Sequence, residues 1–220
     1  MKINKQLKKI LKKTFLYNVY LHFFRKFPGS KNYWEKRYKK GGNSGVGSYN
    51  KQAEFKATGI NKFVLEKNIN SVIEFGCGDG NQLSFTVYKK YIGLDVSVSA
   101  VQRCINKFET DQTKSFYLYD TLSFKDNHSL FTAELALSLD VIYHLIEDNI
   151  FHLYMHHLFQ SSSKFVIIYA NDKDSKTKYH VRERKFSNWI KKHENNWKLI
   201  REIKDDNFWN SFYIYENKHV

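Results

Sequence analysis

The residues best placed for chemistry lie in one glycine-rich turn, the segment VIEFGCGDGNQL at positions 72–83. An apolar run leads there into three glycines, before helical sequence resumes: Gly76, Gly78 and Gly80. Glycines at the end of a strand permit positive φ angles and let a ligand approach the backbone closely. The dinucleotide pattern G-x-G-x-x-G would need a glycine at position 81, which holds Asn81. The pattern is instead E-x-G-x-G-x-G, beginning at Glu74, and it predicts a nucleotide-type cleft.

Acidic side chains close the neighbouring apolar runs. Asp95 ends the run after the glycine turn, 19 residues beyond Gly76, where a carboxylate can accept hydrogen bonds from both hydroxyls of a ribose. Asp120, in YLYDTL, and Asp140, in SLDVIYHL, end the next two runs. For Glu74 and Asp120 a solvated acid at a strand end is the alternative.

Histidines and arginines supply the other candidates. His144 follows the fourth apolar run and can act as a general base or orient an acceptor, with a structural histidine as the alternative. His180, Arg182 and Arg184 alternate along the chain, so in an extended segment they would point the same way and could clamp a phosphate or carboxylate. A solvated loop of charges is the alternative for these three residues.

The cysteines and the remaining histidines indicate no metal centre. Two cysteines, Cys77 and Cys104, exclude a disulfide scaffold and an all-cysteine zinc site. Cys77 is interpreted as a small residue in a tight turn, and Cys104 as a buried residue of a helix. The histidines of FHLYMHHLF are predicted to lie on a helix surface: His152, His156 and His157. We predict no metal site.

The elements that position these residues follow from hydrophobic patterning. Seven runs of strand length alternate with helical stretches, at residues 71–76, 91–96, 115–120, 134–140, 164–170, 197–203 and 210–216. The first five are continuously apolar, as in parallel strands covered on both faces, and the last two read as an antiparallel hairpin. A helix is expected over residues 50–68. This order predicts an α/β fold with a Rossmann-like, doubly wound, mostly parallel seven-stranded sheet and a C-terminal antiparallel hairpin.

The net charge of +14 is concentrated at the N-terminus. Residues 1–40 hold thirteen Lys and Arg against one acid, whereas the other 180 residues hold 23 bases and 21 acids. Residues 1–30 are predicted to form a basic amphipathic helical arm, and residues 31–220 the main domain. The apolar stretch of the arm is too short to span a bilayer. Packing on the domain, membrane contact through residues 1–28 and nucleic-acid binding stay open for the arm, and the nearly neutral domain disfavours nucleic acid as the substrate.

The order and spacing of these motifs resemble those of the class I S-adenosylmethionine-dependent methyltransferases, over about residues 31–216. The resemblance implies S-adenosyl-L-methionine as cofactor, with its methionine part held by the glycine turn, including Glu74 and Cys77. It implies that Asp95 binds the ribose and that Asp120 faces the adenine amino group. The neighbouring residues implied in the site are Val96 beside the adenine, Thr121 next to Asp120, and Leu139 and Asp140 beside the sulfonium and the acceptor. An aromatic element ahead of the core is expected to cover the methionine end, through Tyr33, Arg37 and Tyr38, with plain packing as the alternative.

The absence of two motifs disfavours adenine and cytosine bases as the methyl acceptors. Methyltransferases of the adenine amine carry Asp/Asn-Pro-Pro-aromatic where this chain has Asp140-Val141-Ile142-Tyr143, and the Pro-Cys nucleophile of cytosine methyltransferases is absent. Residues 33–50 and 180–190 resemble small methyltransferases of bacterial surface-polysaccharide synthesis. That resemblance implies O-methylation of a sugar, or of a phosphorylated or phosphoramidate group, on an anionic capsule or lipopolysaccharide precursor. Catalytic roles are then expected for His144 and His180, and acceptor contacts for Tyr143, Arg182 and Arg184.

The expected location is the cytoplasm, with the arm able to rest on the inner face of the membrane. Two other functions stay open at this stage. One is an RNA methyltransferase that grips RNA with the arm, and the other is a non-catalytic module that keeps the cofactor cleft.

Overall fold

The computed structural model describes residues 27–175, 179–205 and 209–219. The predicted membrane-contacting arm falls almost entirely on residues 1–26, which lie outside the described part. Within that part the chain forms seven strands in one sheet, β1 Val72–Phe75, β2 Tyr91–Asp95, β3 Lys114–Leu118, β4 Ala133–Leu139, β5 Ser162–Ala170, β6 Trp197–Lys204 and β7 Ser211–Asn217. The α-helices are α3 Ser30–Lys39, α4 Asn50–Glu66, α5 Val98–Lys107, α6 Asp148–Gln160 and α7 Phe186–His193, and the 3₁₀ turns are η1 Val46–Ser48, η2 Gln82–Phe85 and η3 Ile142–His144.

The strand order is β3-β2-β1-β4-β5-β7-β6. The first five strands are parallel, and β7 runs antiparallel to both β5 and β6. The order therefore reverses between β1 and β4, where the chain moves from one half of the sheet to the other. This topology confirms the predicted mostly parallel sheet with its terminal hairpin, and it places a switch point, the usual position of a ligand cleft, at the carboxyl ends of β1 and β4.

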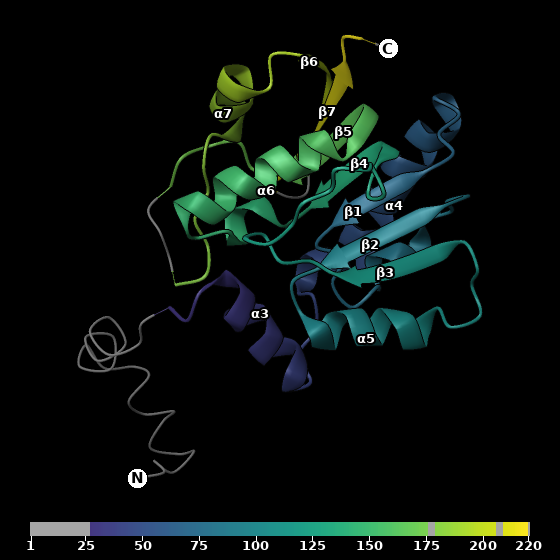
Figure 1. Ribbon diagram of the computed structural model, residues 1–220, viewed down its shortest axis with the longest axis vertical. Helices are drawn as coiled ribbons and strands as arrows, with labels where there is room; N and C mark the ends of the chain where they lie inside the picture. Colours follow the sequence, from purple (N-terminus) through teal and green to yellow (C-terminus); the bar gives the residue numbers. More distant parts are fainter. Residues whose placement is uncertain (1–26, 176–178, 206–208, 220) are drawn as a thin grey trace.

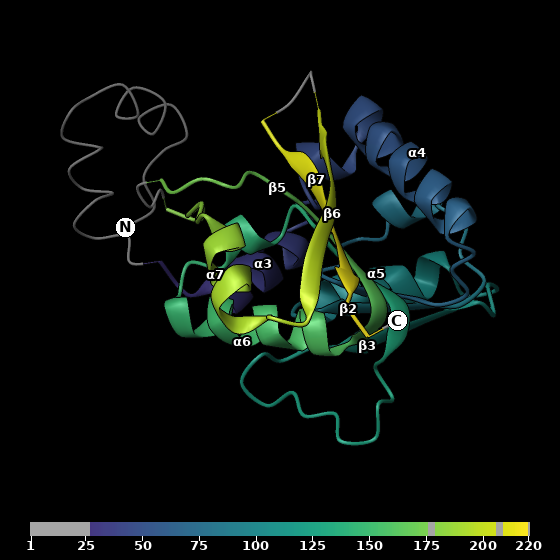
Figure 2. The ribbon, with the colours of Figure 1, turned by 90° about the horizontal axis from the view of Figure 1, so that it is seen from above.

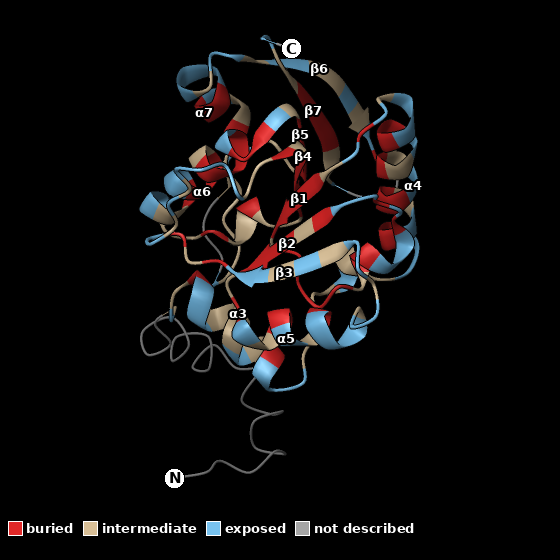
Figure 3. Ribbon diagram, turned by 45° about the vertical axis from the view of Figure 1, so that its right-hand side comes forward, coloured by how far each residue is buried: buried red, intermediate tan, exposed pale blue. Residues whose placement is uncertain are grey.

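Helices cover both faces of the sheet, as Figures 1 and 2 show. Helices α6 and α7 pack on one face through an apolar cluster that includes Phe151, Met155 and Phe186. Helix α4, the turn η2 and Cys104 of α5 pack on the other, in a cluster that includes Ile60 and Phe63. The central strands β1 and β4 are buried along almost their whole length because each has neighbouring strands on both sides and helices on both faces, and Figure 3 shows these buried residues in red.

Two connections depart from the expected pattern. The glycine turn is not followed by an α-helix, since residues 82–85 form only the 3₁₀ turn η2 before the chain reaches β2. Strand β3 connects to β4 with no helix, and β3 is an edge strand whose residues Tyr117 and Leu118 are exposed. The prediction of five strands buried on both faces is therefore wrong for β3, which has one neighbouring strand and lacks the helix that a parallel crossover normally lays over the sheet.

The described residues include no helix that is both long and apolar enough to cross a membrane.

Candidate active site

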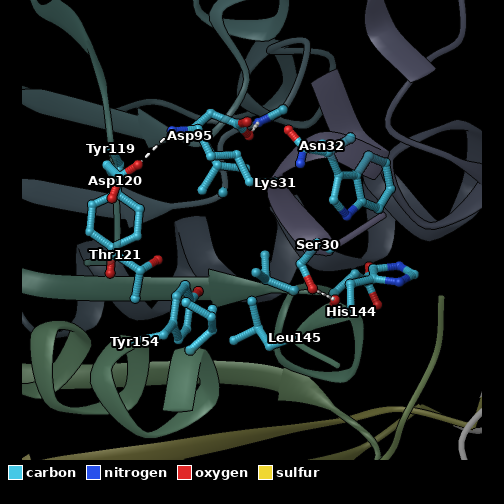
Figure 4. Close-up of a pocket in the computed structure, with 18 of the residues that line it drawn as sticks. Ser30, Lys31, Asn32, Asp95, Tyr119, Asp120, Thr121, His144, Leu145 and Tyr154 are labelled. Atoms are coloured by element: carbon cyan, nitrogen blue, oxygen red, sulfur yellow. Dashed lines mark hydrogen bonds and ion pairs between the residues drawn. The ribbon is translucent and has the colours of Figure 1, made fainter. Parts of the chain in front are cut away.

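A cavity of about 260 Å³ opens at the carboxyl ends of the first four strands, at the switch point between β1 and β4. Its floor is formed by the glycine turn, the end of β2, the residues after β3 and the residues after β4. Helix α3 and the loop that follows it cover the cavity, and the start of α6 closes one side (Figure 4). The sequence therefore brings together, around one cavity, residues from five segments that lie far apart in the chain.

The glycine turn passes directly under this cover. Gly76 and Gly78 line the cavity with φ angles of +86° and +60°, a conformation that favours glycine. A Cβ on Gly78 would lie 2.3 Å from Ser44 Oγ of the covering loop, and one on Gly76 would lie 2.5 Å from Val141 Cγ2. These two positions thus need glycine for backbone conformation and for space. Gly80 packs against α5 and does not line the cavity.

Asp95 is the last residue of β2, and its carboxylate lies beside the glycine turn that follows β1. It is buried, lines the cavity and accepts hydrogen bonds from the backbone N–H groups of Gly78 and Ser97, both at 2.9 Å. Burial raises the pKa of Asp95 to about 6, although these two backbone donors oppose the shift. Each carboxylate oxygen keeps a further lone pair, so Asp95 can still accept hydrogen bonds from a ligand. Val96, beside it, also lines the cavity.

Glu74 and Cys77 lie beneath the turn, and neither lines the cavity. Glu74 is buried and accepts a hydrogen bond from Tyr91 Oη at 2.7 Å, and burial raises its pKa to about 7. Cys77 is buried beside Cys104. The contact with the Cys104 thiol and the burial of Cys77 both raise the pKa of Cys77. Cys104 Sγ donates to the carbonyl of Gly78 at 3.2 Å. Glu74 and Cys77 therefore support the glycine turn from below and do not themselves contact the cavity, so they can affect a ligand only through the turn.

The residues after β3 form the opposite end of the cavity. Thr121 is buried, and Asp120 is bridged by Lys31 of α3, with 2.5 Å between Nζ and Oδ2. Hydrogen bonding to Lys31 lowers the pKa of Asp120. Figure 4 shows this pair and Tyr119 along one wall. The sequence predicted a role for Asp120 and Thr121, but it gave no indication of Lys31.

Helix α3 is fastened across the cavity mainly by polar contacts. At its start, Ser30 donates to Glu147 through its backbone N (2.9 Å) and its Oγ (2.6 Å). Further along, Glu35 accepts hydrogen bonds from the hydroxyls of Ser97 and Ser99, both at 2.7 Å. At its end, Arg103 of α5 donates to the carbonyl of Tyr38. Few apolar side chains of α3 are buried, so the helix is attached to both walls of the cavity without being part of the core.

Of the three residues expected from the covering element, only Tyr38 lines the cavity. Tyr38 is buried, lines the cavity and hydrogen-bonds through its hydroxyl with Ser44 Oγ at 2.9 Å. Tyr33 and Arg37 do not line the cavity, since Arg37 donates to the carbonyl of Asn43 and Tyr33 stacks on His180. Trp34 lines it instead. In a helix, positions 34 and 38 share a face, whereas 33 and 37 lie on the adjacent one, and the 3.6-residue period could have separated these two pairs.

His144 lines the cavity next to Ser30, whose single hydroxyl hydrogen is shared between Glu147 and the His144 carbonyl oxygen, 2.8 Å from Ser30 Oγ (Figure 4). The Nδ1 atom of His144 lies 2.8 Å from the carbonyl oxygen of His180. A carbonyl only accepts, so Nδ1 carries the proton and Nε2 keeps a lone pair. Burial lowers the pKa of His144 to about 4, so its ring is neutral at pH 7. This is the tautomer and charge state that a general base requires.

His180 itself does not reach the cavity. Its ring stacks between those of Tyr33 and His144, with centroid distances of 4.7 Å and 5.5 Å. The structure therefore places His180 behind His144, where its carbonyl fixes the His144 tautomer. Its predicted catalytic role can be exercised only through His144.

Asp140, the first residue after β4, lines the cavity in the positive-φ region (φ +61°). It accepts hydrogen bonds from Lys56 of α4 and from Tyr143, which is partly buried and does not line the cavity. Leu139 completes this wall. Lys56 was not predicted, because a lysine on the apolar face of a helix gives no sequence signal for a partner 84 residues away.

Arg182 and Arg184 do not line the main cavity. Both bind Asp148 and the carbonyl of Ile146, and Arg184 also binds the carbonyl of Leu145. They line a second, more open cavity of about 280 Å³ beside Lys185. A clamp at the reacting centre, as expected from their alternation, is therefore not formed. The two arginines fasten the segment after β5 to the start of α6.

Of the three histidines of α6, His152 is exposed and His156 partly exposed, as predicted, and only His157 is buried. His157 is buried and bonded to Tyr119 Oη at 2.7 Å, so its placement on a helix surface was wrong. His156 pairs with Glu194, and His152 accepts from the indole of Trp189. Among residues 27–175, 179–205 and 209–219, no group of three or more His, Cys, Asp or Glu could hold a metal ion.

The sequence matches no protein-family model and no curated protein. Solved structures share the fold. The N-methyltransferase NodS from Bradyrhizobium japonicum WM9, in complex with S-adenosyl-L-homocysteine, is 13% identical with a TM-score of 0.65, over 86% of this chain and 98% of that one. The magnesium protoporphyrin IX methyltransferase ChlM from Synechocystis PCC 6803 is 14% identical with a TM-score of 0.63, over 85% and 97%. The methyltransferase domain of bacterial CtHen1-C is 17% identical with a TM-score of 0.60, over 74% and 97%. The chain therefore has the Rossmann-like fold of the class I S-adenosylmethionine-dependent methyltransferases.

Proposed function

We propose that the protein is a methyltransferase that transfers the methyl group of S-adenosyl-L-methionine to an oxygen atom of a surface-glycan precursor. The observation that carries the methyltransferase assignment is the cavity at the switch point. It combines an open glycine turn, a strand-end carboxylate on β2 and a second one after β3, in a fold shared with methyltransferases crystallised with this cofactor or its product.

The lining of the cavity suits such a ligand. Without a Cβ, Gly76 and Gly78 leave the backbone open to the methionine part, and Asp95 can accept from the ribose hydroxyls. Asp120 and Thr121 stand where the adenine would lie. After the ion pairs Lys31–Asp120 and Lys56–Asp140 are set aside, the lining still holds the carboxylates of Asp95 and Glu147. This balance favours a ligand that carries a sulfonium and an ammonium group.

The bound cofactor supplies an electrophilic methyl group for in-line displacement, so the protein chiefly positions the acceptor and excludes water. An acceptor hydroxyl also has to lose a proton. His144 is the group in the cavity lining that can take it, because Nε2 keeps its lone pair and the ring is neutral at pH 7. Its low pKa makes it a weak base, which suits transient acceptance of a proton as the oxygen–methyl bond forms.

The proposal that the acceptor is a glycan rests on the resemblance of residues 33–50 and 180–190 to surface-polysaccharide methyltransferases. An anionic group of the acceptor would be repelled by the carboxylates of the main cavity. The second cavity offers such a group the basic side chains of Arg182, Arg184 and Lys185, although Asp148 already pairs with both arginines and the acceptor would have to compete with it. The basic composition of residues 1–40 supports contact with the anionic inner face of the membrane, where lipid-linked precursors are built.

The test is transfer of a labelled methyl group from S-adenosyl-L-methionine to extracted lipid-linked glycan precursors, assayed beside total RNA. We expect label on the glycan fraction, with a mass increase of one methyl group, and its loss in His144→Ala. Label on RNA, with salt-dependent binding that disappears when residues 1–28 are removed, would establish the RNA methyltransferase instead. Tight cofactor binding with no transfer to either fraction would indicate a binding module.

A further inference from the structure

A lysine is completely buried next to the cavity. The side chain of Lys56, on α4, has 0% exposure, and its Nζ lies 2.6 Å from Oδ2 of Asp140, whose side chain is 10% exposed. The ammonium group also lies 5.3 Å from the centre of the Tyr169 ring. Burying an ammonium group is very costly unless a carboxylate balances it. A helix position that simply packed on the sheet would be apolar, so the Lys56–Asp140 pair requires an explanation.

Both oxygens of Asp140 are already engaged. Oδ2 is bonded by Lys56, and Oδ1 accepts from Tyr143 Oη at 3.0 Å and from Asn210 Nδ2 at 2.6 Å. The covering loop also lies against this carboxylate, because a Cβ on Gly47 would be 2.6 Å from Oδ2. Asp140 is thus held by α4, by the turn after β4 and by the start of β7, and it is not turned toward an acceptor as a base.

The charged and titratable groups around the pair come from every element packed on it. Glu74 of β1 feels the charge of Lys56, which lowers the Glu74 pKa against the larger effect of burial. The other groups that face Asp140 are Tyr143 and His144 of η3 and Tyr169 of β5, which is bonded to Asp205. Lys56 is therefore the cation that balances Asp140 in this surrounding.

We propose that Lys56 is a positioning residue that neutralises Asp140 and holds its carboxylate in the cavity wall. As a result, this end of the cavity binds the cationic methyl donor no more tightly than the neutral product. The inference rests on the proposed function, because the reaction converts a sulfonium into an uncharged thioether. An unpaired carboxylate beside the sulfur would hold the donor more tightly than the transition state, in which the sulfur loses its charge. A neutral pair avoids this loss.

The test compares the affinities of S-adenosylmethionine and S-adenosylhomocysteine, which differ by one methyl group and one charge. Isothermal titration calorimetry would be run on the wild type, Lys56→Met, Asp140→Asn and the double variant. Lys56→Met leaves the carboxylate unpaired, so the preference for the cationic ligand rises at least tenfold. Asp140→Asn leaves the ammonium unpaired, so the preference falls at least tenfold. The double variant returns to the wild-type ratio. Lys62→Met, an exposed lysine of α4, is the matched control and leaves the ratio unchanged.

A pH series separates this role from a merely structural one. In Lys56→Met the unpaired buried carboxylate has a raised pKa, so the preference for the cationic ligand grows as the pH rises and Asp140 ionises. Titration of the neighbouring Glu74 and His144 affects the wild type and the double variant alike, and the effect of Asp95 cancels because both ligands carry the same ribose. The two single variants shift in opposite directions, so one folded single variant is enough to decide the sign.

Equal ratios in the wild type and in either folded single variant would overturn the inference. So would shifts of the same sign in both single variants, which would indicate simple loss of packing. Thermal unfolding of the ligand-free proteins adds a readout that needs no cofactor, with each single variant less stable and the double variant recovering. A wild type that binds neither ligand would instead refute the proposed function, so the two failures are distinguishable.

Discussion

The carboxylate of Glu35 is one of the polar attachments of α3 over the cavity, and its replacement gives a quantitative prediction. Glu35 accepts three hydrogen bonds, from Ser97 Oγ and Ser99 Oγ at 2.7 Å and from Ser99 N at 3.1 Å. In Glu35→Gln one oxygen becomes an NH₂ group that cannot accept, so one or two of these bonds are lost. Because the site is largely solvated, each loss costs about 0.5–1.5 kcal/mol. Opening of α3 should therefore become easier by about 1–2 kcal/mol, or roughly 5- to 30-fold.

Hydrogen exchange measured by mass spectrometry checks this value. Backbone amides of residues 30–40 should exchange 5- to 30-fold faster in Glu35→Gln, by the same estimate, while those of the buried strand β5 stay unchanged. Glu54→Gln, an exposed carboxylate on α4, is the matched control. The hydrogen bonds from Ser97 and Ser99 lower the pKa of Glu35, so its contribution is present at neutral pH and is lost as the pH falls into and below the usual range of a glutamate. Unchanged exchange in residues 30–40 would refute the view that the hydrogen bonds of Glu35 help to hold α3 over the cavity.

Three further changes test the site. His144→Ala should slow methyl transfer by roughly 10²- to 10⁴-fold in single-turnover assays, and it should leave the affinity for S-adenosylhomocysteine within about twofold of the wild type. An equal loss of transfer rate and of affinity would show that His144 is not the base. The affinity for S-adenosylhomocysteine should rise between pH 5 and 7, because burial raises the pKa of Asp95 to about 6 and only the ionised carboxylate accepts from both ribose hydroxyls. The same raised pKa means that the contribution of Asp95 to folding stability is present at acid pH and is lost as the pH rises through about 6, and denaturant titration at each pH reports it. Gly78→Ala should abolish S-adenosylhomocysteine binding and cost about 1–3 kcal/mol of folding stability. The reason is that the φ angle of Gly78 is +60° and that a Cβ there would lie 2.3 Å from Ser44 Oγ. A variant that binds the ligand normally would contradict the proposed role of the turn.

The central parallel strands were predictable because they are buried. Continuous apolar runs of six or seven residues, separated by turn residues, indicate strands covered on both faces, and the glycine turn and Asp95 fall at strand ends where the fold places ligands. The hairpin was predictable from its polar connection. These signals are local, so a single sequence contains them.

The helix predicted after the glycine turn did not form, for reasons that lie partly outside the segment. Asn81 donates to the carbonyl of Ser48, and Gln82 donates to that of Ala53, so both side chains tie the segment to the covering loop and α4. Thr86 and Val87 then add β-branched residues that disfavour a helix. Only the last of these signals can be read locally.

The least predictable residues are those whose partners are distant in sequence. Lys56 pairs across 84 positions with Asp140, and Arg184 reaches 36 positions back to Asp148. His180 does not share the direction of the arginines, since its ring stacks with those of Tyr33 and His144. Arg182 and Arg184 do reach the same place, but the sequence did not indicate what lies there. Carbonyls and a carboxylate at the start of α6 already occupy the arginines there.

Titration of the purified protein with S-adenosylmethionine in a calorimeter tests the central claim most directly. The account predicts one bound cofactor per chain. Asp95→Asn should weaken it by about 10- to 150-fold, corresponding to the 1.5–3 kcal/mol of hydrogen bonds to a charged group. Glu109→Gln, an exposed carboxyl at the end of α5, should bind like the wild type. The account is contradicted if the wild type does not bind the cofactor, or if Asp95→Asn binds it as tightly as the wild type does.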